Sequence, residues 1–94
     1  MSESAKEIIE TGLGSIGKIK IIRALAEENK LATVYTLHNK TRLKREDIKK
    51  NLDDLVKIGW VTQSKYANVM YGINRENAYV SRLIEFFSDA GYIG

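Results

Sequence analysis

Cysteine and proline are absent from the sequence, and histidine occurs once, as His38. Without cysteine the chain cannot form a disulfide, a thiolate metal site or a thiol nucleophile. A single histidine gives no histidine metal cluster and disfavours a catalytic dyad. We therefore expect no metal, no cofactor and no enzyme activity. The absence of proline lets helices and strands run without that interruption.

Long apolar runs are also missing, since none contains more than four residues. A membrane-spanning helix needs about 20 apolar residues, and the charged amino-terminal segment lacks the apolar region of a signal peptide. The 94 residues, of which 44% are apolar, correspond to one small domain over 1–94. The sequence therefore indicates a single intracellular, cytoplasmic domain without a membrane partner.

Apolar spacing and capping residues predict four helices, a β-hairpin and a last helix, a mostly helical fold of the α+β class. Ser4 and Glu7 have the spacing of a capping box, Ser15 precedes the second helix, and Asn74 or Asn77 caps the last one. The expected helices are 5–11, 16–28, 34–39, 44–58 and 77–90, and the expected strands are 60–63 and 69–73. In the second helix the expected apolar stripe consists of Ile16, Ile19, Ile22 and Ala26, with Ile21 and Leu25 beside it.

The net charge of +3 is unevenly distributed along the chain. Residues 38–50 contain six lysines and arginines against two acids, a net charge of +4. These cations are Lys40, Arg42, Lys44, Arg45, Lys49 and Lys50. A solvated helix face explains such a cluster as well as a binding surface does, so its position in the fold must decide between them.

The basic cluster covers the end of one short predicted helix, a turn, and the start of a longer helix. In a helix-turn-helix unit the second helix enters the DNA major groove with its amino-terminal half. Ile48 and Leu52 turn one side of this helix toward the core, and Arg45 and Lys49 lie away from that side. Arg45 can read guanine O6 and N7, and Lys49 or Lys50 can contact a base or a phosphate. Cations come first along this helix and acids later, which favours insertion of its amino-terminal end.

The apolar spacing of this region resembles the winged helix-turn-helix regulators of the ArsR/MarR type, which are common in archaea and bacteria. Those proteins have a leucine in the positioning helix, another six residues later, and a hydrophobic-x3-Leu-x2-Leu recognition helix. Glycine, a large apolar residue and valine follow. The corresponding residues are Leu37, Leu43, Ile48, Leu52, Leu55, Gly59, Trp60 and Val61. Upstream, 18–26 resembles the first core helix of these regulators, and downstream 69–74 resembles the returning strand of the wing.

The resemblance covers about 15–76 and implies a winged helix-turn-helix with a two-stranded β-hairpin wing and flanking terminal helices. It also implies an archaeal-type or bacterial transcriptional regulator that binds double-stranded DNA sequence-specifically, with recognition helix 44–58 in the major groove. The expected DNA contacts are the six cations of the basic cluster together with Lys65 and Tyr66 at the wing tip. A hairpin that mainly completes the core explains the wing sequence equally well, because Lys65 is its single cation.

The sequence also departs from the pattern of these regulators. Arg42 stands where they often have glycine, which predicts a wider or differently shaped turn. Lys44 replaces the common serine or threonine at the start of the recognition helix, so a cap is lost and a cation is gained. Metal-sensing members use cysteines or histidine clusters, and this chain has neither. We interpret His38 as a packing or phosphate-contact residue.

The last predicted helix is apolar over much of its circumference. Such a helix has more surface to bury than one small core accepts, so we expect a homodimer formed through it. The expected interface residues are Tyr79, Leu83, Phe86 and Phe87. The alternative is a monomer in which the terminal helices pack on the winged helix.

A second functional class remains open beside DNA binding. Winged helices also serve as protein–protein interaction modules within larger assemblies, without reading bases. The adjacent acids Asp53 and Asp54 and the sparsely charged wing are compatible with that alternative.

Overall fold

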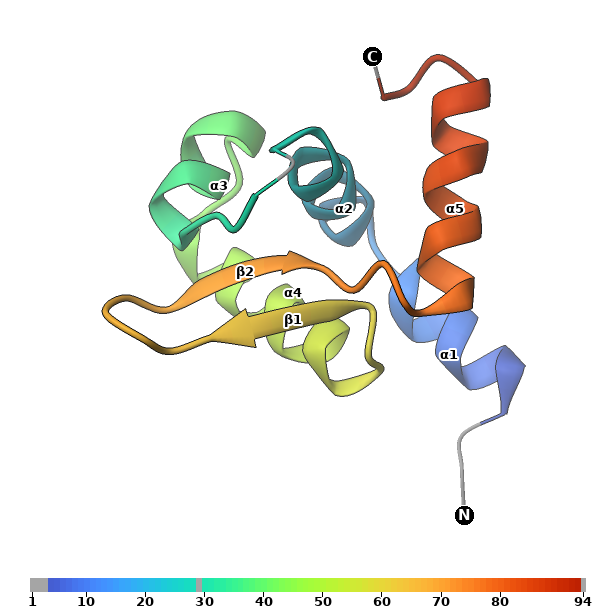
Figure 1. Cartoon of the computed structure of the whole chain (residues 1–94), viewed down its shortest axis with the longest axis horizontal. Coiled ribbons are helices and arrows are strands. Elements are labelled where there is room, and N and C mark those ends of the chain that lie inside the picture. The colour runs from blue at the N-terminus through green and yellow to red at the C-terminus, as the bar shows by residue number, and fades with distance from the viewer. Residues whose placement is uncertain (1–3, 29, 94) are drawn as a thin grey trace.

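The computed structural model describes residues 4–28 and 30–93 of the chain. Its elements follow the predicted order, with four helices, a hairpin and a last helix (Figure 1). Their bounds are α1 Ala5–Gly12, α2 Ile16–Glu28, α3 Val34–Thr41, α4 Arg45–Lys57, β1 Val61–Ser64, β2 Met70–Ile73 and α5 Ala78–Asp89. The largest difference from the prediction is in α3, which extends two residues beyond 34–39.

The starts of α1, α2 and α5 are capped by side chains that the sequence indicates. Ser4 Oγ accepts a hydrogen bond from the Glu7 amide at 3.2 Å, and Ser15 Oγ accepts one from the Lys18 amide at 3.2 Å. Asn77, not Asn74, caps α5. These bonds satisfy amide groups that have no partner inside the helix, which fixes where each helix begins.

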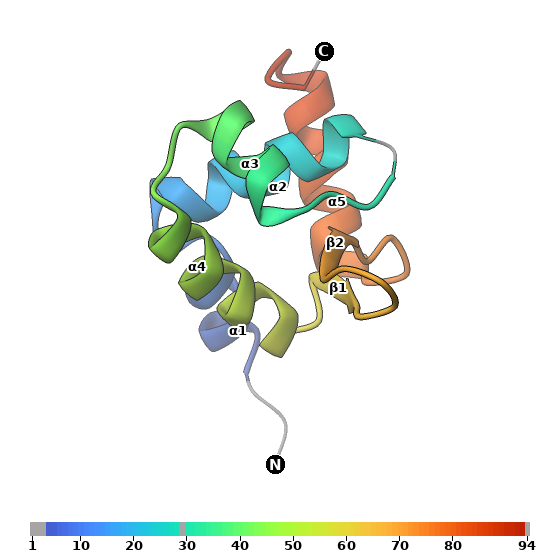
Figure 2. The same cartoon turned by 90° about the vertical axis from the view of Figure 1, so that its left-hand side faces the viewer.

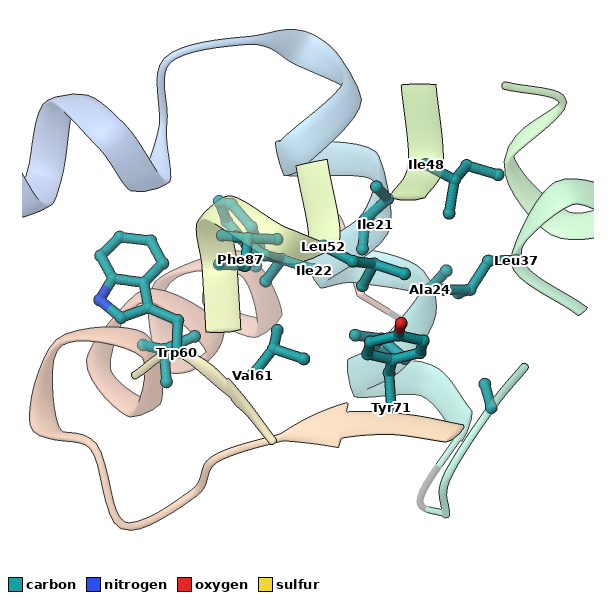
Figure 3. Close-up of a cluster of buried hydrophobic side chains, with 14 residues drawn as sticks. Ile21, Ile22, Ala24, Leu37, Ile48, Leu52, Trp60, Val61, Tyr71 and Phe87 are labelled. Carbon is teal, nitrogen blue, oxygen red and sulfur yellow. The ribbon is translucent and has the colours of Figure 1, made fainter. Parts of the chain in front are cut away.

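The core lies between α2, α3, α4, the hairpin and α5. Figure 3 shows Trp60 at one end of the buried cluster and Leu37 at the other, with Ile22 and Leu52 between them. In α2 the predicted stripe is wrong at Ile16, which is 71% exposed. The buried face of this helix instead centres on Ile21, because Ile16 is the first residue of the helix and lies outside the packed core.

The hairpin is antiparallel, with Val61 paired to Ile73 and Ser64 to Met70. The segment before α3 pairs with β2 through an isolated antiparallel β-bridge, in which Ala32 and Tyr71 exchange two backbone hydrogen bonds of 2.8 Å. Val61 and Tyr71 are 2% and 5% exposed. The base of the hairpin therefore belongs to the core, and only its far end projects from the body of the fold (Figure 1).

The amino-terminal helix is attached to the core by a close approach and a buried charge. A Cβ atom at Gly12 would lie 2.2 Å from two ring carbons of Trp60, so only glycine lets α1 pack so near this buried ring. Lys18 of α2 is 8% exposed, and its ammonium donates to the Thr11 carbonyl at 2.8 Å. The same ammonium pairs with Asp54 of α4 at 3.0 Å, so it ties together α1, α2 and α4.

Candidate nucleic-acid interface

The turn between α3 and α4 ends α3 with a residue in the left-handed region. Arg42 has φ 65° and ψ 12°, and its amide donates to the His38 carbonyl at 2.9 Å. Glycine adopts this conformation without strain, whereas a residue with a Cβ does not. Arg42 itself takes the left-handed conformation that glycine would adopt. The turn therefore keeps this cap although the glycine is missing.

Two side chains of α3 hold the turn in place. His38 Nδ1 lies 2.7 Å from the Leu43 carbonyl oxygen, and because a carbonyl only accepts, the imidazole is the donor. Thr41 Oγ1 donates to the Leu37 carbonyl at 2.7 Å and accepts from the Leu43 amide at 3.2 Å. His38 therefore has a packing role in the turn, one of the two roles expected for it. These bonds fix the start of α4 relative to α3.

We expect Arg42→Gly to stabilise the fold by about 0.5–1 kcal/mol, because it relieves the left-handed strain at this position. Arg42→Ala is the matched control, since it removes the same guanidinium but keeps a Cβ. Urea denaturation of the three proteins measures the difference. If the glycine variant is no more stable than the alanine variant, Arg42 is not strained.

Helix α4 separates a buried face from a basic face. Ile48, Leu52 and Leu55 are all 0% exposed. Arg45 and Lys49 are exposed, one turn apart. The other exposed cations beside them are Arg42, Lys44 and Lys50. Lys44 occupies the position before the helix and makes no side-chain cap bond, as expected from the loss of serine or threonine.

The acidic residues of α4 lie in two places. Glu46 and Asp47 occupy its first turn, where a negative charge is favourable at the positive end of the helix dipole. Asp54 faces α2, and its carboxylate is neutralised by an ion pair with Lys18 of the same fold. Asp53 is exposed. Of the two acids that are compatible with a protein-interaction module, one is therefore already engaged.

Lys40 differs from the other members of the basic cluster. Its ammonium lies 2.8 Å from a carboxylate oxygen of Glu28, at the end of α2. This hydrogen bond lowers the pKa of Glu28 below its ordinary value. Within the described residues, Arg42, Lys44, Arg45, Lys49 and Lys50 form no such ion pair.

Sequence reasoning missed Tyr35. This tyrosine lies on α3 and is 61% exposed, and the guanidinium carbon of Arg45 lies 5.6 Å from its ring centroid. The available signal was its spacing, because Tyr35 precedes the inward-facing Leu37 by two residues and so lies on the other side of the helix. An aromatic residue is thus placed beside the leading cation of α4.

Comparison with known proteins identifies the fold. No protein-family model and no curated protein sequence matches the chain. Among solved structures, the chain is similar to the crystal structure of an ArsR family transcriptional regulator. The TM-score is 0.63 at 17% sequence identity, over 98% of this chain and 96% of that one. The chain has a winged-helix fold. In this winged helix, α3 and α4 are the two helices of the helix-turn-helix, in the places of the positioning and recognition helices, and the β1–β2 hairpin is the wing.

The winged helix presents α3, the start of α4 and the wing together on one side of the molecule (Figure 2). At the wing tip Lys65 is exposed and Tyr66 is 98% exposed. The tip therefore has solvent-facing side chains while the base of the wing packs in the core. The base of the wing thus completes the core while its tip faces solvent, an arrangement with which both interpretations of the hairpin are compatible.

The four residues expected at a dimer interface lie in different surroundings on α5. Phe86 and Tyr79 are 63% and 43% exposed. Leu83 is half-buried against the core of the winged helix. Phe87 is 8% exposed and makes an edge-to-face contact with Tyr92 at 5.0 Å between ring centroids. The outward apolar surface of α5 therefore consists of Phe86 and Tyr79, with Leu83 at its edge, and Phe87 belongs to the core.

Over 4–28 and 30–93, no three histidine, cysteine or acidic residues are grouped so that they could hold a metal ion. Over the same residues, none of the helices has the length and apolar character needed to cross a bilayer.

Proposed function

We propose that this winged-helix protein is a homodimeric transcriptional regulator that binds double-stranded DNA sequence-specifically. The observation that carries the proposal is the arrangement of α4. Its apolar face is fully buried, and exposed cations without ion-pair partners among the described residues are concentrated at its amino-terminal end. A protein surface that only needs solubility gains nothing from this one-ended distribution, whereas a helix entering the major groove does.

In the proposed complex the amino-terminal half of α4 occupies the major groove. Arg45 reads guanine O6 and N7, and Lys49 and Lys50 contact bases or phosphates. Arg42 and Lys44, at the turn, contact the phosphate backbone. The remaining proposed contacts are Lys40, which exchanges Glu28 for a phosphate, and Lys65 and Tyr66 at the wing tip.

The similarity to a transcriptional regulator supports this role through the shared winged-helix fold. In the proposed division of the chain, 15–76 is the winged-helix core that carries the DNA contacts, and 77–90 supplies the dimer contact. In archaea and bacteria the DNA lies in the cytoplasm. We therefore propose that this regulator acts in the cytoplasm of an archaeal or bacterial cell.

The dimer is proposed from the outward face of α5. Phe86 and Tyr79 lie seven residues apart, which places them on one side of the helix, with Leu83 between them. Large exposed aromatic side chains on one helix face are typical of protein interfaces. A twofold dimer through α5 presents two recognition helices to half-sites about one helical turn apart, a spacing of ~34 Å.

Replacing Phe86 with glutamate is expected to convert the dimer to monomers, because it places a charge in the centre of the proposed apolar contact. Sedimentation equilibrium is expected to show a mass of twice 10.7 kDa for the wild-type chain and of 10.7 kDa for the variant. Ser88→Glu, also exposed on α5, is the matched control and is expected to stay dimeric. A wild-type chain that sediments as a monomer would contradict the proposed dimer.

Selection from a pool of random duplexes tests the proposed function. We expect the wild-type chain to enrich inverted repeats whose half-sites contain guanine and lie about 10 base pairs apart. The competing function, a protein-interaction module, predicts no enrichment at low salt. It predicts instead a protein partner that binds the Arg45→Ala/Lys49→Ala double variant as tightly as the wild type.

A further inference from the structure

Tyr35 and Arg45 form a contact between two exposed side chains of different helices. The Arg45 guanidinium carbon lies over the Tyr35 ring at 5.6 Å from its centroid. Tyr35 is 61% exposed, so little of its ring is buried in the core. A cation over an aromatic face at this distance is attracted by the ring quadrupole. The contact therefore lies on the surface between α3 and α4, outside the hydrophobic core.

The helix that carries the Tyr35 ring is fixed relative to the start of α4. Tyr35 precedes His38 by three residues, so the two side chains lie on one side of α3. The hydrogen bond between His38 and the Leu43 carbonyl ties that side of α3 to the turn before α4. Thr41 adds a bond to the Leu43 amide. The backbone of α3 at Tyr35 consequently has a defined position relative to the start of α4, and the ring lies within cation–π distance of Arg45.

The cation–π contact restricts the guanidinium without using its donors in hydrogen bonds. The ring attracts the positive charge of the whole group, and the N–H groups of the guanidinium remain available as donors. Reading guanine O6 and N7 requires two of those donors in one fixed orientation. An unsupported arginine loses considerable side-chain freedom when it adopts that orientation, and a ring that holds it beforehand lowers this entropic cost.

We propose that Tyr35 is a positioning residue that orients Arg45 for base recognition, and thereby sets how strongly the protein prefers guanine at the base pair that Arg45 contacts. The inference rests on the proposed function, because it concerns the specificity of the same DNA interface. It adds a role for the positioning helix, which otherwise contacts only the phosphate backbone. Tyr35 is thus expected to affect specificity without contacting a base.

The proposal is tested by measuring the affinity for a selected duplex and for the same duplex with the guanine of the Arg45 base pair replaced. The ratio of the two affinities is the discrimination. We expect Tyr35→Leu to lower this discrimination about two- to fivefold, the range for one exposed cation–π contact. Tyr35→Phe keeps an aromatic face and is expected to retain it. The salt dependence of binding is expected to stay the same in all three proteins, because no phosphate contact is removed.

A double variant and a DNA-free measurement complete the test. Adding Tyr35→Leu to Arg45→Ala is expected to change discrimination no further. In the free protein, NMR is expected to show upfield ring-current shifts of the Arg45 side-chain protons that persist in Tyr35→Phe and disappear in Tyr35→Leu. If the wild-type chain binds duplex DNA and Tyr35→Leu discriminates between the two duplexes as strongly as the wild type, this inference alone is overturned. Failure of the wild-type chain to bind duplex DNA, with the ring-current shifts present, would overturn the proposed function instead.

Discussion

Replacing Lys49 and Lys50 with alanine is expected to weaken duplex binding about 10³-fold at ~0.1 M salt and to flatten its salt dependence. Each phosphate neutralised by a cation adds about −0.9 to the slope of log K against log salt, so six to eight contacts per dimer give a slope near −5 to −7. The double variant removes four cations per dimer and is expected to make the slope about 3 to 4 units less steep. Fluorescence anisotropy over a salt series measures both quantities.

The matched control is Lys6→Ala/Lys57→Ala, which removes the same charge from exposed positions elsewhere. Lys6 lies on α1, and Lys57 lies in the last turn of α4, at the end opposite to the basic cluster. We expect the slope of this variant to match the wild-type slope. Equal losses of slope in the two double variants would show that net charge, rather than the start of α4, drives the binding.

Replacing Asp54 with alanine is expected to lower the free energy of unfolding by about 2 kcal/mol, because it leaves the buried ammonium of Lys18 without its counter-charge. Fully buried pairs that lose one partner cost about 3–5 kcal/mol. The expected cost is smaller here, since the Asp54 side chain is 42% exposed and water reaches the site. The Thr11 carbonyl, at 2.8 Å, remains as a neutral partner for Lys18. Urea denaturation at fixed protein concentration measures the loss.

Two further variants separate the ion pair from general effects on α4. Asp53→Ala makes the same change one residue earlier, at an exposed position, and is expected to alter stability by no more than about 0.5 kcal/mol. Lys18→Met removes the buried charge and leaves a carboxylate that water can hydrate, so it is expected to cost less than Asp54→Ala. A Lys18→Met variant less stable than Asp54→Ala would contradict this description of the pair.

The helices and the hairpin could be predicted because their signals are local. The apolar spacing of Ile48, Leu52 and Leu55 identifies the buried face of α4, and these residues are all 0% exposed. Capping side chains mark the helix starts, since Ser4 and Asn77 bond amides within three residues of themselves in sequence. The basic cluster could be placed on the turn and on the start of α4 for the same reason.

The partners of charged and aromatic side chains could not be predicted, because they depend on how distant segments pack. Lys18 and Asp54 are far apart in sequence, and nothing local marks this lysine as buried. Lys40 was expected to be free for phosphate, yet the end of α2 brings Glu28 beside it. The apolar spacing of α5 likewise left open that Phe87 packs in the core while Phe86 faces outward.

The most direct test of the central claim, that α4 enters the major groove, is methylation protection of guanine N7 on a selected duplex. We expect protected guanines in two successive major grooves, about 10 base pairs apart, and loss of one protected guanine per half-site with Arg45→Ala. A duplex that is bound while every guanine N7 stays reactive would contradict it.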